Sequence, residues 1–106
     1  NKAGAQLVAA KLTSSNLTGT TLTGANLTDA ALTGAAASRA NFSGANLTRT
    51  KLAKADVQFA NFTNANLSGA DLTGVVLAGT VFTGATFSAT TVCPNGKPAG
   101  TTRCGL

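Results

Sequence analysis

Hydrophobic residues recur at every fifth position along most of the chain. Residues 65–69, Ala-Asn-Leu-Ser-Gly, show the phrase: small, polar, Leu or Phe, Thr or Ser, then Gly or Asn. The register runs from Leu7 to Val92 and gives eighteen central positions, of which eleven are Leu and four are Phe. A small residue, most often Ala, lies two positions before each centre. A register that persists over so many units indicates a repeat protein.

A period of five predicts a short straight side followed by a corner. It matches neither the 3.6-residue period of a helix nor the sustained two-residue period of a strand. The small residue and the centre are two apart, so both can point to one side of an extended segment. The remaining residues make a turn, and Gly at sites such as Gly19, Gly44 and Gly69 suits a positive φ. We therefore expect the centres and small residues inside and the other residues outside.

Three phrases carry a resemblance to a known family. Residues 25–29, 45–49 and 70–74 resemble the A-(D/N)-L-x-x motif of pentapeptide-repeat proteins, and the resemblance covers about residues 5–92. It implies an all-β fold, a right-handed quadrilateral β-helix with four units, or twenty residues, in each coil. We expect a solenoid of about 4.5 coils in residues 1–92 and a disulfide-closed C-terminal cap in residues 93–106.

A coil of twenty residues predicts which side chains stack on one another. Asp29 then falls beneath Arg49, and Lys51 falls beneath Asp71, which predicts a surface charge ladder of these four residues. In the same way Arg39 falls beneath Phe59, where a cation–π contact can form. The inward positions predict a core ladder that includes Leu27, Leu47, Leu67, Phe42, Phe62 and Phe82.

The composition argues against an enzyme. The chain has no His and only three acidic residues, so a general base would have to be Asp29, Asp56 or Asp71. Asp29 and Asp71 are better explained by the charge ladder, and no insertion long enough to form a cavity interrupts the repeats. We expect a non-enzymatic protein with no catalytic, cofactor-binding or metal site.

The last fourteen residues depart from the repeat. They contain both cysteines, Cys93 and Cys104, with Pro94, Asn95 and Gly96 between them. Two cysteines are too few for a zinc or iron–sulfur site, so we expect a disulfide, with two free thiols as the alternative. A similar Cys-Pro-Asn-Gly tail occurs in exported bacterial members of the family that the repeats resemble.

A persistent disulfide indicates an oxidising compartment. Together with the lack of Met, it predicts a secreted, periplasmic or cell-surface bacterial protein whose signal peptide has been removed. No run of residues is apolar enough to predict a transmembrane helix, so we expect no membrane insertion.

The net charge of +5 points to anionic partners. An anionic envelope polymer is one candidate. Nucleic acid is disfavoured, because a dense basic stripe with stacking aromatic residues is missing. Family members that mimic DNA and inhibit gyrase need a strongly acidic face, and this basic chain does not fit that activity.

One side of the predicted solenoid carries regular Asn and Thr residues, among them Asn26, Thr28, Asn46 and Thr48. We expect the Asn residues to form hydrogen-bonded ladders. A flat face of this kind resembles those of ice-binding solenoids, which makes surface binding an alternative function. The favoured interpretation is a structural or protein-interaction module whose partner is itself or another protein. Its predicted end interface contains Leu7, Leu12 and Leu17, where stacking would give a filament or a dimer.

Overall fold

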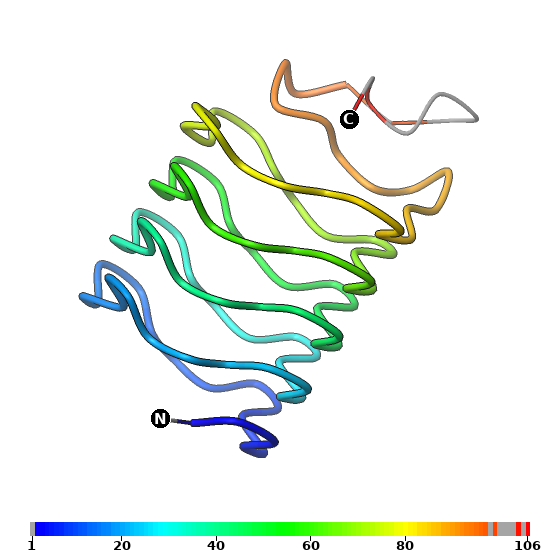
Figure 1. The fold of residues 1–106 in the computed structure, drawn as a ribbon. Coiled ribbons are helices and arrows are strands. Elements are labelled where there is room, and N and C mark those ends of the chain that lie inside the picture. The colour runs from blue at the N-terminus through cyan, green and yellow to red at the C-terminus, as the bar shows by residue number, and fades with distance from the viewer. Residues whose placement is uncertain (1, 98, 100–103, 105) are drawn as a thin grey trace.

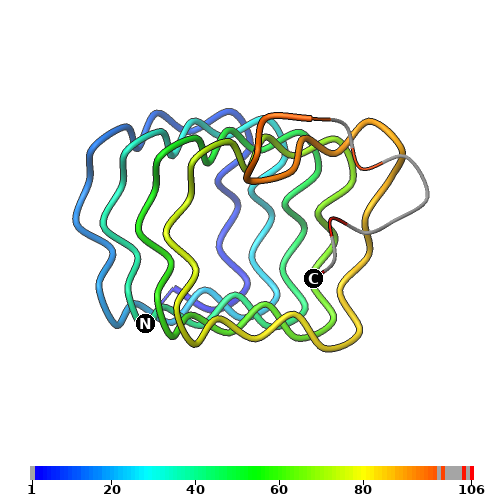
Figure 2. The same ribbon diagram turned by 90° about the horizontal axis from the view of Figure 1, so that it is seen from above.

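The chain winds into a stack of four-sided coils. In the computed structural model, which describes residues 2–97, 99, 104 and 106, each unit from Gln6 to Asn66 forms a parallel β-bridge with the unit twenty residues later. The bridges are five residues apart, as in Gln6 to Asn26 and Lys11 to Ala31, so four bridges complete one turn of the chain. Figures 1 and 2 show the coils stacked in chain order, from the blue N-terminal coil to the orange C-terminal segment.

Each side of a coil is one bridge long. Residues 2–97 contain no helix and no extended strand, only bridges separated by turns. The bonding is nevertheless that of a parallel sheet. The Leu27 N–H donates to the Asn46 carbonyl at 2.7 Å, and the Asn46 N–H donates back to the Ala25 carbonyl at 2.8 Å. The turn is closed inside the unit, where the Ala30 N–H donates to the Leu27 carbonyl at 2.9 Å.

Most corners of the solenoid share a left-handed φ. From Gly4 to Gly84, the residue two positions after each centre has a φ between 55° and 71°. This is the φ that the third residue of a type II turn requires, and Gly adopts it without strain. Several units have a side chain there instead, including Arg39, Arg49 and Phe59. The fold therefore holds some bulky residues in a left-handed conformation that costs about 1–2 kcal/mol each.

The interior is a thin column of stacked side chains. Leu27, Leu47, Leu67, Phe42 and Phe62 are buried, while Phe82 is only partly buried because it lies in the last complete coil. The rings of Phe42 and Phe62 stack with centroids 4.8 Å apart, and those of Phe62 and Phe82 with centroids 5.2 Å apart. The spacing between neighbouring strands sets the distance between the rings.

Three of the threonines at small-residue positions of the core bond to a carbonyl of the neighbouring coil. Thr50 is fully buried, and its hydroxyl donates to the Leu27 carbonyl at 2.8 Å. The Thr80 and Thr91 hydroxyls donate in the same way to the carbonyls of Val57 and Leu67. A hydroxyl can replace the usual Ala methyl group because a backbone acceptor of the neighbouring coil lies within its reach.

The register slips by one residue after Phe87, so the prediction that Val92 is a centre is wrong. Asp71 bridges to Val92, a separation of 21 instead of 20, and the turn moves to residues 89–90. Thr91 and Cys93 are buried in its place. The hydroxyl groups of Ser88 and Thr91 now accept the Gly69 N–H, at 2.9 Å and 3.2 Å, where a backbone carbonyl accepts it in the other coils.

The C-terminal segment is tied to the stack by covalent and hydrogen bonds. Cys93 and Cys104 form a disulfide with a Cα–Cα distance of 5.3 Å. The Ala99 N–H donates to the Thr91 carbonyl at 2.7 Å, and the side chain of Leu106 packs against the core. The remainder of the predicted cap, residues 98, 100–103 and 105, lies outside the described residues.

Candidate interaction surfaces

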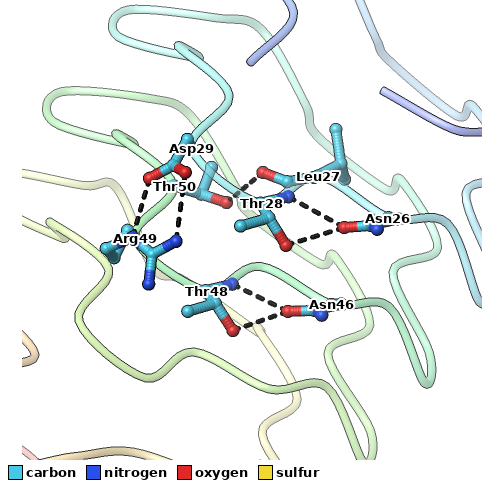
Figure 3. Close-up of polar contacts among 8 residues, drawn as sticks. All are labelled: Asn26, Leu27, Thr28, Asp29, Asn46, Thr48, Arg49 and Thr50. Atoms are coloured by element: carbon cyan, nitrogen blue, oxygen red, sulfur yellow. Dashed lines mark hydrogen bonds and ion pairs between the residues drawn. The ribbon is translucent and has the colours of Figure 1, made fainter. Parts of the chain in front are cut away.

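One corner carries the first pair of the predicted charge ladder. The Arg49 guanidinium donates from Nε to Asp29 Oδ1 at 2.8 Å and from its terminal nitrogen to Oδ2 at 3.1 Å (Figure 3). This two-point hydrogen bond lowers the pKa of the Asp29 carboxyl, and the charges of Arg49 and Lys51 lower it further. The same contact raises the pKa of Arg49. Both side chains of the pair are exposed, and exposed ion pairs contribute little to stability.

The second predicted pair of the ladder is different. Lys51 and Asp71 bridge through their backbones, but their side chains form no ion pair in the part of the chain that the structure describes. Asp71 Oδ1 instead accepts the Thr73 N–H at 3.0 Å and the Thr73 hydroxyl at 2.6 Å. The local hydrogen bonds hold the carboxylate along its own side, and Lys51 stays exposed.

The Asn and Thr face is bonded mainly within each unit instead of along a ladder. The Asn26 side-chain oxygen accepts from the Thr28 N–H at 3.1 Å and hydroxyl at 2.7 Å, and Asn46 repeats this with Thr48 (Figure 3). Among the described Asn side chains, the bond between coils runs from Asn26 Nδ2 to Gln6 Oε1 at 3.5 Å. The Thr28 and Thr48 hydroxyl hydrogens are therefore already donated to protein acceptors.

A different corner combines a cation with apolar side chains. The Arg39 guanidinium carbon lies 4.9 Å from the centroid of the Phe59 ring, which agrees with the predicted contact. The ring also leans toward Gly79 of the next coil, where an added Cβ would come within 2.5 Å of Cε1. Val76 and Val81 are exposed on the two sides that meet at this corner. Neither valine was predicted as a surface feature, although each stands where earlier coils have polar or small residues.

The predicted end interface is divided between exposed and buried positions. Leu7 and Leu12 are partly buried, whereas Leu17 is buried. Lys2 occupies the central position of the preceding unit, because the Ala5 N–H donates to its carbonyl as the same turn bond does in the units centred on Leu7 to Phe82. A lysine thus precedes Leu22 in the column that continues with stacked Phe rings.

The described residues were also compared with the pattern of a metal site and of a membrane-spanning helix. No three His, Cys, Asp or Glu side chains come together there as a metal site would require. A helix with the length and apolarity to cross a bilayer is not found in the same residues.

The fold and these surfaces define a four-sided β-solenoid built from five-residue units. The sequence profile of pentapeptide repeats matches in eight copies, over residues 5–44, 25–58, 32–69 and 60–92. The chain belongs to the pentapeptide-repeat family. Proteins of this family are structural or interaction modules, and related structures imply that the β-helix is right-handed.

Solved structures give the same result. A pentapeptide repeat protein from the thylakoid lumen of Arabidopsis thaliana is 32% identical with a TM-score of 0.53, and the match covers 80% of this chain and 63% of that one. Rfr23 from the cyanobacterium Cyanothece 51142 is 31% identical with a TM-score of 0.42, covering 81% of this chain and 62% of that one. A pentapeptide repeat protein from Nostoc PCC 7120 is 30% identical with a TM-score of 0.39, covering 76% and 62%.

This chain therefore spans less than two thirds of the length of these three proteins. A comparison with curated proteins finds no match.

Proposed function

We propose that the chain is a non-enzymatic scaffold that holds a partner protein outside the reducing cytoplasm. The observation that carries the proposal is the unbroken run of bonds between coils, from Leu7 to Gly74, with no insertion that forms a cavity. Such a stack holds outward side chains at fixed spacings on an extended surface, which suits the binding of another protein. A catalytic site is instead usually a concave pocket. A regular surface binds with little ordering of its own side chains.

The disulfide supports a location outside the cytoplasm. Cys93 is buried and forms a disulfide with Cys104. In most cytosols the reducing conditions would keep these two cysteines as free thiols. One related protein comes from the thylakoid lumen, a compartment reached by export. The proposal is therefore a secreted, periplasmic or lumenal module whose C-terminal coil is closed by an oxidised pair.

The experiment is to recover the protein from its native cells under rapid alkylation and to measure mass and size together. We expect no alkylated thiol and a complex larger than the 10.4 kDa chain, with a second protein in it. Recovery of the chain alone with two alkylated thiols would reject both halves of the proposal. Recovery of an oxidised monomer would reject the scaffold function but would still agree with a location outside the cytoplasm.

Association between ends is a second candidate, because the first coil leaves backbone donors free. The N–H groups of Lys11 and Asn16 have no acceptor within the described part of the chain, and Leu7 and Leu12 are partly exposed. Edges of this kind add further strands. Lys2 opposes association between ends, because it occupies a central position of the repeat and its charge must be desolvated when another coil stacks on it.

Sedimentation velocity at rising concentration tests this association. We expect dimers or filaments from the wild-type chain and monomers from Leu12→Lys. Thr13→Lys is the matched control, since it adds the same charge one residue away at an exposed position. A wild-type chain that stays monomeric throughout would refute association by the chain alone.

A further inference from the structure

Exposed apolar side chains gather at one corner of the solenoid. Of the described residues, the large hydrophobic side chains that are exposed are Val8, Phe59, Val76 and Val81. Val8 lies in the first coil, but the other three surround one corner, with exposed fractions of 53% for Phe59, 45% for Val76 and 42% for Val81. We call Phe59, Val76, Gly79 and Val81 the corner patch.

The two valines break the pattern of their columns. Val76 bridges to Asp56, and Val81 bridges to Asn61. Each valine therefore occupies the position that a polar residue has in the preceding coil. Neither valine contributes to the interior, since both occupy the position before an inward centre. An outward valine on an otherwise polar side gains nothing from core packing, and clustered exposed apolar residues mark interaction sites.

Phe59 adds a second, independent observation, because its backbone conformation is unfavourable. Its φ is 58°, and the same corner has Gly19, Arg39 and Gly79 in the other coils. A bulky residue at positive φ is an outlier, and such strain gathers at functional sites. The Arg39 contact offsets part of this cost, but it leaves more than half of the Phe59 side chain in solvent.

We propose that the corner patch binds a short acidic segment of a partner protein, with an apolar side chain of that segment seated against Phe59, Val76 and Val81. This inference rests on the proposed scaffold function and names the chemistry of its partner. The charge argues for an acidic segment. Arg39 lies at the patch and forms no ion pair in the described residues, and the whole chain carries a net charge of +5.

The size of the patch argues for a segment instead of a second folded surface. A stable interface between folded proteins needs about 800 Å² from each partner. Three exposed side chains around one corner fall short of that area, but they suit one anchor residue with charged neighbours. A bound segment would place its carboxylates beside Arg39 while its anchor covers the apolar atoms, so that both features of the corner are used.

The probe is a fluorescein-labelled dodecapeptide with a central Phe flanked by Asp and Glu. Two matched peptides carry Lys in place of the acidic residues or Ala in place of the Phe. Binding is followed by anisotropy, and the bound site by amide shifts in nuclear magnetic resonance spectra. We expect the acidic Phe peptide alone to bind, with the largest shifts at residues 39, 59, 76, 79 and 81.

Four variants of the chain separate a binding role from a structural one. Phe59→Gly restores the residue that suits the turn, and Val81→Asn repeats Asn61 of the coil before it. We expect each to fold with the wild-type melting temperature or a higher one and to bind the acidic peptide at least about tenfold more weakly. Arg39→Gln should weaken binding and reduce its salt dependence. Val8→Thr, an exposed valine far from the patch, should change nothing.

Several outcomes would overturn the inference. One is that the acidic peptide binds equally to the wild type, Phe59→Gly and Val81→Asn. Another is that the Lys peptide binds as tightly as the acidic one, or that no peptide binds. A third is that the amide shifts are confined to other coils. Binding of vesicles of phosphatidylcholine and phosphatidylglycerol that Phe59→Gly abolishes would assign the patch to a membrane instead. A dimer in sedimentation that Phe59→Gly dissociates would assign it to a second copy. The scaffold proposal is tested separately, by whether the oxidised chain is recovered in a native complex, and none of these peptide results decides that question.

Discussion

The ring of Phe59 occupies the space that a side chain at position 79 would need. Phe59 and Gly79 lie at the same corner in consecutive coils, and both have a left-handed backbone. The ring atoms lie where a Cβ on residue 79 would be, so a bulky corner residue in one coil depends on a glycine in the next.

Gly79→Ala should therefore destabilise the chain more than Gly24→Ala. The two glycines have φ values of 71° and 66°, so the strain of an L-residue, about 1 kcal/mol, is shared. A Cβ at position 24 meets nothing within 4 Å, whereas one at 79 collides with the Phe59 ring. Urea unfolding of both variants measures the difference. The Phe59→Ala background should remove the excess, and an excess that persisted there would mean that the ring is not its cause.

Charge in the core should unfold the solenoid. Leu47 is fully buried in a column one side chain wide, so Leu47→Asp leaves a carboxylate with neither water nor a partner. Asn46→Ala, one residue earlier, removes the acceptor for Thr48 on an exposed residue and should cost about 1 kcal/mol. Circular dichroism melts compare the two. Losses of similar size would contradict the assignment of inward and outward positions.

The Asp29–Arg49 pair should make stability depend on pH in the acid range. The pKa of Asp29 is lower in the folded chain than its ordinary value of 3.8. Its stabilisation is therefore complete above the ordinary value and is lost as the pH falls through the lower folded pKa. Asp29→Asn should flatten the fall in melting temperature below pH 4, and 1 M salt should shrink the difference from the wild type. An unchanged acid profile in Asp29→Asn would show that the contact contributes nothing.

Deleting Ala89 and Thr90 together should prevent the disulfide. The double deletion shortens the separation between Asp71 and Val92 from 21 residues to 19, which brings Val92 to an inward position and turns Cys93 outward. Deleting Ala89 alone is the control, because a separation of twenty keeps Val92 at the bridge and Cys93 inward. Alkylation of the non-reduced proteins followed by mass measurement should find two thiols in the double deletion and none in the control. A disulfide in both would show that the C-terminal segment adapts to either register.

Much of this architecture could be predicted because each unit repeats the same local pattern. The five-residue spacing identified the inward side chains, and twenty-residue stacking identified the contacts Asp29–Arg49 and Arg39–Phe59. The stacking could not show that Asp71 would bond to Thr73 rather than to Lys51, because a local hydrogen bond competes with an ion pair of similar strength. The slip after Phe87 is also hidden, since Val92 is apolar and fits the old register.

The corner patch was missed for a similar reason. Valine at an outward position does not disturb a five-residue count, because the centre beside it is unchanged. Only the fold places Val76 and Val81 next to Phe59, on two different sides of a coil that share one corner. Single-residue features of a repeat protein gain meaning from their neighbours twenty residues away.

The bridges twenty residues apart also make the length of the protein independent of its cross-section. Residues 25–44 are bonded below to residues 5–24 and above to residues 45–64 through the same pattern of donors and acceptors. A duplicated coil would present to each neighbour the contacts that it already has. Duplication or deletion of a twenty-residue segment can thus lengthen or shorten such a protein one coil at a time while the contacts between coils stay the same.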